Sequence, residues 1–131
     1  MELTDLYYFH EYFNREFFRG RLQPVIFEFA EQLQALRYNG DTIPPVISVD
    51  DNLFERSDRL FILTALLCEM THQHCQARGI ADTTGKTGKH TEAFTRAAWA
   101  HGMANGGNAL QPGTIEKLTE HLQQYDAIKW H

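Results

Sequence analysis

Apolar residues recur at intervals of three and four positions along much of the chain, a spacing that predicts helices with one buried face. Candidate helix ends support this reading. Gly20 follows the first periodic stretch, Ser57 is a suitable N-cap for the second, and Gly79 follows the last turn of the second. The four main helices are predicted at residues 3–18, 58–77, 91–101 and 114–125.

Three short stretches between the first two helices are rich in β-branched and aromatic residues, which predicts strands at 24–30, 33–38 and 46–49. The pair Asn39-Gly40 favours a tight hairpin turn after the second strand. Pro44 and Pro45 precede the third strand and predict that it lies at a sheet edge or begins at Pro45. The order of one helix, three strands and three helices indicates an α+β fold.

Two segments are rich in glycine and small polar residues and are predicted as loops. Residues 79–89 connect the central helix to His90, and we expect this loop to border a cleft. Residues 105–108, with the sequence Asn-Gly-Gly-Asn, are expected to form a flexible segment before the last helix.

The composition narrows the class of protein. A chain of 131 residues fits one domain. Its net charge of −5 argues against a dominant nucleic-acid-binding surface but leaves a local basic patch open. The longest apolar run, residues 60–68, is too short to cross a membrane, and the acidic start lacks the features of a secretory signal. The two cysteines lie seven positions apart in one predicted helix, about 10 Å and too far to pair. We therefore expect a soluble, cytoplasmic protein.

The central helix carries the candidate chemistry. Cys68 and His72 are four residues apart, so they project from the same face at a distance suited to chelating a metal ion. The segment Cys68-Glu69-Met70-Thr71-His72 differs by one residue from the zinc-binding motif H-E-x-x-H, in which two histidines bind the metal and the glutamate is a general base.

Four segments in order resemble the SprT-like metallopeptidase family, which includes the Spartan-type proteases. Residues 13–22 are similar to its opening F-N-x-x-F-F-x-G-x-L, residues 46–49 to the strand before its metal-site helix, and residues 66–73 to its L-L-H-E-M-x-H. Residues 88–94 are similar to its G-x-H-x-x-x-F, whose histidine is the third zinc ligand. The resemblance covers about residues 1–103, and residues 104–131 add a C-terminal helix.

The resemblance implies one zincin-like domain over residues 1–131, with a small mixed sheet packed on a central metal-site helix. It implies a zinc ion bound by Cys68, His72 and His90, with Glu69 as the general base in the hydrolysis of a peptide or protein substrate. In that chemistry the metal activates a water molecule and polarises the carbonyl group, while the glutamate accepts a proton.

Two departures from the family keep other functions open. Cys68 replaces a histidine, and a thiolate holds zinc roughly 3 to 3.5 Å from Cβ, whereas an imidazole holds it roughly 6 Å away. No four-cysteine zinc ribbon follows, which argues against a DNA-linked substrate. The alternatives are an inactive SprT-like pseudoenzyme that binds a protein partner, or a redox-sensitive site that loses zinc when Cys68 is oxidised.

Other chemical groups carry weaker signals. Cys75 is expected in the core, because a short thiol arm seven residues from Cys68 cannot share its metal. We expect His74, His101 and His121 at the surface, although His101 could reach the site from the end of its helix. Gly85-Lys86-Thr87 is similar to the end of a phosphate-binding loop, but the preceding glycine is misplaced and no strand leads in, so we reject nucleotide binding.

Overall fold

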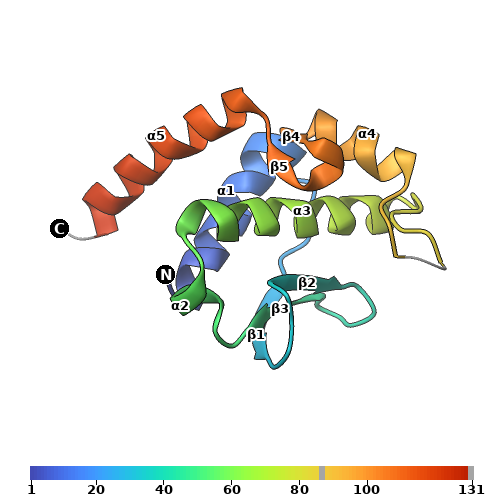
Figure 1. Ribbon diagram of the computed structural model, residues 1–131, viewed down its shortest axis with the longest axis horizontal. Helices are drawn as coiled ribbons and strands as arrows, with labels where there is room; N and C mark the ends of the chain where they lie inside the picture. Colours follow the sequence, from blue (N-terminus) through green and yellow to red (C-terminus); the bar gives the residue numbers. More distant parts are fainter. Residues whose placement is uncertain (86–87, 130–131) are drawn as a thin grey trace.

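The computed structural model describes residues 1–85 and 88–129. Figure 1 shows helix α3 running through the middle of the molecule, with a small sheet on one side of it. The mixed sheet and the α+β class agree with the sequence prediction. The helices are α1 (Leu3–Phe18), α2 (Leu53–Arg56), α3 (Arg59–Ala77), α4 (Glu92–Ala100) and α5 (Pro112–Lys129), and a 3-10 turn, η1, covers Asn105–Gly107. The strands are β1 (Ile26–Ala30), β2 (Leu36–Asn39), β3 (Val46–Asp50), β4 (Met103–Ala104) and β5 (Ala109–Leu110).

The main sheet has the order β1-β3-β2, with β1 parallel and β2 antiparallel to β3. The edge position predicted for the third strand is therefore wrong, because β3 is central. Pro45 lies just before β3, and its carbonyl accepts a hydrogen bond from the Ile26 amide at 2.9 Å. Because Pro45 precedes the strand, its lack of an N–H group removes no hydrogen bond between β3 and its neighbours. The tight turn predicted at Asn39-Gly40 is also wrong, since residues 40–45 join β2 to β3.

Helix α3 begins one residue later than predicted. Its N-cap is Asp58, whose carboxylate accepts a hydrogen bond from the Phe61 amide at 2.8 Å. Ser57 instead ends the short helix α2, where its amide donates to the Leu53 carbonyl. Gly79, with a positive φ of 68°, follows the last turn as predicted.

The hydrophobic core lies where α1, α3, α4 and the inner face of the sheet meet. Phe27, Ile47, Val49 and Leu36 turn from the strands toward the helices, as the two-residue period of a strand requires. The largest fully buried side chains are Phe9, Phe13, Phe94, Leu6, Ile47, Leu53, Ile62, Leu63, Leu66, Leu67, Met70 and Met103.

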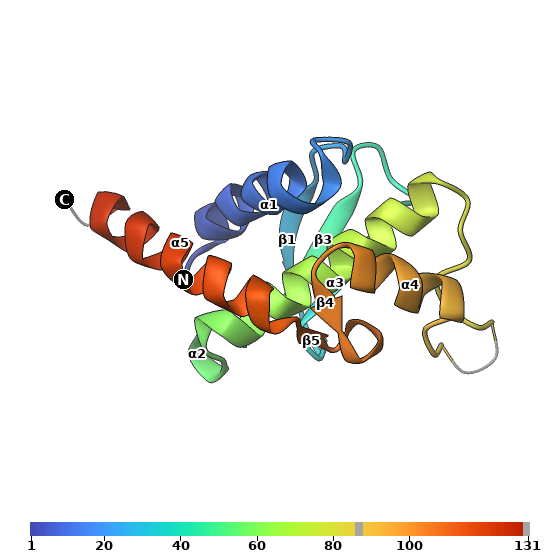
Figure 2. The same cartoon turned by 90° about the horizontal axis from the view of Figure 1, so that it is seen from above.

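Helix α5 runs past the N-terminal part of α1 and projects beyond the start of the chain (Figure 2), and side chains join the two helices. His121 stacks on Tyr12 with ring centroids 3.8 Å apart and forms a 2.7 Å hydrogen bond with the Tyr8 hydroxyl. Asp5, only 2% exposed, accepts hydrogen bonds from Lys129 at 2.5 Å and from the Tyr125 hydroxyl. These contacts extend the helix to Lys129, four residues beyond the predicted end.

Among the described residues, the helices all fall short of the length and apolarity that crossing a bilayer requires.

Replacing Asp5 by asparagine is expected to destabilise the protein by about 2 to 4 kcal/mol, because Lys129 loses its charged partner in a largely buried network. Urea denaturation at neutral pH measures this change. Glu11→Gln, which removes an exposed carboxylate from the same helix, is the control and should cost about 0.5 kcal/mol or less. Equal stability of the two variants would contradict a role for Asp5 in anchoring α5.

The difference in stability between the wild type and Asp5→Asn is expected to depend on pH. Burial raises the pKa of Asp5, but the hydrogen bonds from Lys129, Tyr125 and the Glu2 amide, with the charge of Lys129, outweigh burial and leave the pKa below its ordinary value of 3.8. A carboxyl whose pKa is lower in the folded protein stabilises the fold above its unfolded pKa and loses that contribution as the pH falls. The stability difference between wild type and Asp5→Asn should therefore narrow as the pH drops below 3.8.

Candidate metal centre

Three side chains with metal-binding atoms converge at the middle of α3. Cys68 and His72 come from successive turns of that helix, and His90 comes from the residue before Thr91, the N-cap of α4. Their ligand atoms, one sulfur and two ring nitrogens, all lie within 4.8 Å of one another. The structure thus brings together the three residues that the sequence nominated as ligands.

The His72 ring is held by a carboxylate that the sequence analysis did not identify. Its Nδ1 lies 2.8 Å from Asp82 Oδ2, and Gln76 donates a second hydrogen bond to the same oxygen at 3.1 Å. Because a carboxylate accepts hydrogen bonds, Nδ1 carries the proton and Nε2 is left unprotonated and able to bind a metal. Burial lowers the pKa of His72, with Asp82 opposing the shift, so burial favours the neutral imidazole that metal binding requires.

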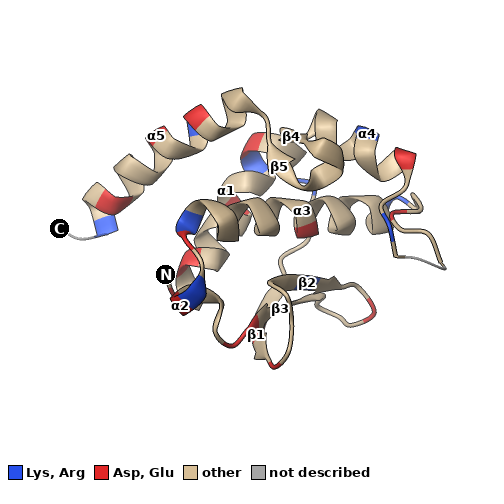
Figure 3. Cartoon of the chain, viewed as in Figure 1, with Lys and Arg blue, Asp and Glu red and all other residues tan. Residues whose placement is uncertain are grey.

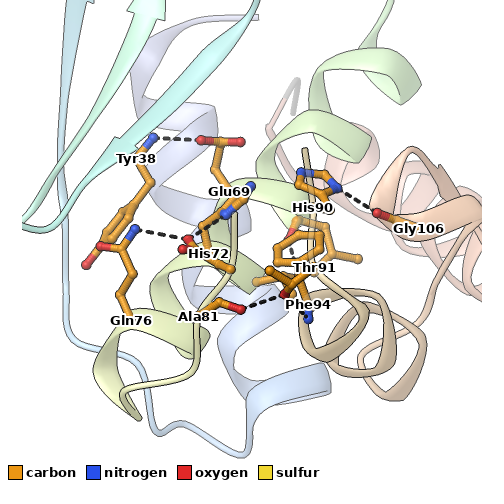
Figure 4. Close-up of polar contacts among 12 residues, drawn as sticks. Tyr38, Glu69, His72, Gln76, Ala81, His90, Thr91, Phe94 and Gly106 are labelled. Carbon is orange, nitrogen blue, oxygen red and sulfur yellow. Dashed lines mark hydrogen bonds and ion pairs between the residues drawn. The ribbon is translucent and has the colours of Figure 1, made fainter. Parts of the chain in front are cut away.

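His90 has an equivalent partner on the main chain. Its Nδ1 lies 2.7 Å from the carbonyl oxygen of Gly106 (Figure 4), an acceptor that again assigns the proton to Nδ1 and leaves Nε2 as the ligand atom. Both histidines are therefore oriented by acceptors at Nδ1, the arrangement common among metal-binding imidazoles.

Phe94 and Gly107 pack around the two imidazoles. The Phe94 ring, fully buried, lies 4.3 Å from the His72 ring and 4.0 Å from the His90 ring, measured between centroids. Gly107 has a φ of +95°, and a Cβ atom added to it would come within 2.6 Å of the Phe94 ring. Glycine at this position therefore allows the η1 turn to approach the site closely.

The η1 turn corrects the prediction of a flexible segment at residues 105–108. Strands β4 and β5 pair on either side of it, with Met103 opposite Leu110, and Gly106 takes a left-handed conformation. This short hairpin fixes the Gly106 carbonyl against His90.

The loop after α3 also supports the site. Thr83 forms an isolated bridge with His90, and the Thr91 hydroxyl donates a 2.6 Å hydrogen bond to the Ala81 carbonyl. These contacts hold Asp82 beside His72. Lys86 and Thr87, part of the rejected phosphate-loop interpretation, lie outside the described residues.

Glu69 is the only acidic residue in α3 and marks the single red position along that helix in Figure 3. Its Oε1 accepts a 2.7 Å hydrogen bond from the Tyr38 amide of strand β2, which Figure 4 shows beside the helix. Burial raises the pKa of Glu69 to about 7, although the Tyr38 hydrogen bond and Arg37 act in the opposite direction. A carboxyl group with a near-neutral pKa is suited to accepting and returning a proton.

Cys68 is partly buried, and burial, with a smaller contribution from Glu69, raises the pKa of its thiol to about 12. The free thiol therefore keeps its proton at neutral pH, and a bound cation would have to displace it. The donor set of one thiolate and two neutral imidazoles suits zinc, whose tetrahedral bonds would separate these ligand atoms by roughly 3.3 to 3.6 Å. The observed separations do not exceed 4.8 Å, which is about 1.2 to 1.5 Å above those values.

Cys75 and the other histidines within residues 1–85 and 88–129 lie away from this centre. Cys75 is fully buried in the core, as predicted. His101 does not reach the site, because it stacks on Phe18 at 4.4 Å and its Nδ1 bonds the Ala97 carbonyl. His74 lies beside His101, and both side chains are partly exposed, as is His121; none of the three belongs to the ligand cluster. Burial and neighbouring positive groups lower the pKa of His74 to about 4.

A groove of about 310 Å³ opens beside two of the candidate ligands, Cys68 and His90. Cys68, Glu69 and His90 line one part of it, together with Gly107 and Asn108 from the turn that holds His90. The candidate metal position and Glu69 therefore face a space large enough for part of a ligand.

Removal of the Asp82 carboxylate is expected to weaken zinc binding by about 10- to 100-fold, since His72 loses the acceptor that fixes its tautomer and ring orientation. Competition against a chromogenic zinc chelator compares Asp82→Ala with Asp51→Ala, an exposed aspartate outside the site. Equal affinities in the two variants would exclude a supporting role for Asp82.

No family model matches the chain, and neither a curated protein nor a solved structure matches it.

Proposed function

We propose that the protein is a SprT-like zinc peptidase in which Cys68, His72 and His90 bind zinc and Glu69 is the general base. One observation carries the proposal: three ligand atoms lie within 4.8 Å of one another, and both imidazoles have acceptors at Nδ1. Histidine ligands of metal sites commonly have an acceptor at one ring nitrogen, which leaves the other nitrogen able to bind the metal.

The chemistry follows from the groups around the ligands. When bound, zinc supplies a Lewis acid that polarises a carbonyl group and makes water more acidic. Glu69 accepts the proton of the attacking water at its carboxylate and passes it to the amine that leaves. Tyr38 binds Oε1 of Glu69, so Oε2 is the oxygen that takes the proton. The near-neutral pKa of Glu69 supports both transfers.

Strand β2 supports a peptide as the substrate. It is an edge strand, and the Tyr38 amide points away from β3 because it donates to Glu69. Main-chain groups of alternate residues in a strand point the same way, so the amide and carbonyl of Leu36 also face the groove. An extended peptide can pair with these groups by adding a strand to the sheet edge.

A second function, a catalytically inactive module that binds a protein partner in the same groove, is favoured by one observation. Burial raises the pKa of the Cys68 thiol to about 12, so the thiol keeps its proton at neutral pH. A neutral histidine in its place would offer an unprotonated Nε2 to the metal. If zinc does not displace that proton, Glu69 remains bound to Tyr38 and the groove can only bind.

Zinc content per chain distinguishes these functions at the first step. Protein purified without a histidine tag or added metal is measured by elemental mass spectrometry, beside His90→Ala and the control His101→Ala. Near one zinc per chain in wild type and His101→Ala, with little in His90→Ala, is expected for the proposed site. No zinc in the wild type after zinc is supplied at neutral pH would overturn the proposal.

A Cys68→His variant then tests catalysis on an unstructured protein such as casein. Activity in the wild type supports the peptidase. Activity that appears only in Cys68→His would identify the natural chain as an inactive relative.

A further inference from the structure

The groove beside the metal centre extends along α3 toward the N-terminal end of the helix. Phe61, Thr64, Ala65 and Cys68 are spaced by three, one and three residues, so they share one face of α3 and form one wall of the groove. The opposite wall comes from residues 34–36, where the chain enters strand β2.

The two parts of this groove differ in chemistry. Near the ligands, the lining includes Cys68, Glu69 and His90, which are its only ionisable groups among the described residues. One turn away, the lining becomes apolar, with Ala35, Leu36, Phe61 and Ala65 joined by the neutral side chains of Gln34 and Thr64. A charged side chain placed there would lose hydration without meeting an opposite charge.

Phe61 shows that this apolar part is open to a ligand. Its side chain is 52% exposed, whereas Leu36 across the groove is 9% exposed. Ala65 between them is small, which leaves room above the helix. A half-exposed phenylalanine facing an apolar wall gains buried area when an apolar group enters.

The apolar part of the groove lies close to the peptide bond that would be cut. Ala65 precedes Cys68 by three residues, which corresponds to about 4.5 Å along the helix axis. An extended peptide advances roughly 3.3 Å per residue, so a side chain one residue from the reacting carbonyl lies near the level of Ala65. Phe61 precedes Cys68 by seven residues, about 10.5 Å along the axis, and bounds the far end of the same space.

We propose that Phe61, Ala65, Leu36 and Ala35 form a specificity pocket for a bulky apolar side chain, such as leucine or phenylalanine, next to the scissile peptide bond. The position of the pocket next to a scissile bond rests on the proposed peptidase function. The binding preference itself requires neither zinc nor hydrolysis, and the two can be tested separately.

The test uses the full chain after zinc removal with EDTA, with alanine methyl groups labelled for NMR. Blocked tetrapeptides that differ at one position, leucine, phenylalanine, aspartate or lysine, are titrated into the protein. We expect the Ala65 methyl signal to shift with the leucine and phenylalanine peptides, and these peptides to bind about 10- to 100-fold more tightly than the aspartate peptide.

Two variants make the assignment specific. Ala65→Leu fills the pocket and should remove the preference, whereas Ala77→Leu, the same change at an exposed position of α3, should retain it. Phe61→Ala should also lower the preference for apolar peptides. It removes a half-exposed side chain, so its effect does not depend on whether a larger residue fits at position 65.

Equal binding of the leucine and aspartate peptides by the wild type, or an Ala65 signal that stays unchanged, would overturn the pocket. That result leaves the peptidase intact if the zinc-loaded protein still cleaves peptides without apolar preference. Conversely, selective binding with no zinc uptake would retain the pocket and reject the peptidase.

Discussion

Glu69→Gln is expected to lower peptide hydrolysis by about 100- to 10,000-fold while zinc content stays at the wild-type level. The amide oxygen of glutamine can still accept the hydrogen bond from the Tyr38 amide, so the geometry around α3 and β2 is preserved. What glutamine cannot do is accept and return a proton. Cleavage of a fluorogenic peptide, measured beside zinc content, separates these two properties.

Glu92→Gln is the matched control, because it makes the same change at an exposed position in the first turn of α4. It should retain both zinc and activity. Wild-type activity in Glu69→Gln would assign the general base to another group, while a loss of zinc in that variant would indicate that Glu69 acts on the metal centre itself.

Gly107→Ala is expected to destabilise the protein by about 2 to 5 kcal/mol and to weaken zinc binding. The substitution combines strain at a φ of +95° with a steric clash, since the new Cβ would lie within 2.6 Å of the Phe94 ring. Phe94 contacts both His72 and His90, so its displacement moves both imidazoles. Urea denaturation and zinc competition measure the two effects.

The neighbouring glycine provides the control. Gly106 also has a positive φ, +67°, but a Cβ there would only meet the Thr95 hydroxyl at 3.7 Å, an ordinary contact. Gly106→Ala should therefore cost about 1 to 2 kcal/mol from backbone strain alone. If Gly107→Ala is no more harmful than Gly106→Ala, the packing of Phe94 does not constrain the site.

Local rules predicted the part of the metal centre that lies within one helix. The pairing of Cys68 with His72 follows from four-residue spacing in α3, and the structure agrees. His90 is eighteen residues further along the chain, so helical spacing could not link it to the site, and its selection depended on the family resemblance. The structure nevertheless brings its ring within 5.0 Å of the His72 ring.

The supporting groups were beyond sequence reasoning for a physical reason. Asp82 lies in a loop without periodicity, and its position beside His72 depends on contacts of Ala81 and Thr83 with Thr91 and His90. The Gly106 carbonyl carries no side-chain signal at all.

The errors in the fold also concern features set by distant contacts. Two prolines suggested either an edge strand or a strand that begins at Pro45. The strand begins at Val46, just after Pro45, and its central position is undisturbed. Two glycines suggested flexibility at 105–108, although positive φ angles there serve a tight turn between paired strands. Proline and glycine restrict or permit local angles, whereas order and position depend on the surrounding packing.

The hydrogen bond between Glu69 and Tyr38 also affects how copies of the protein meet. An edge strand with free main-chain groups can pair with the same strand of another molecule, which is a common first step toward aggregation. Glu69 occupies the Tyr38 amide, so a strand of another molecule cannot pair along the whole edge, whereas a short peptide can still pair with the main-chain groups of Leu36. The residue proposed for catalysis therefore also discourages self-association through this edge, so Glu69→Ala should promote aggregation more than Glu69→Gln.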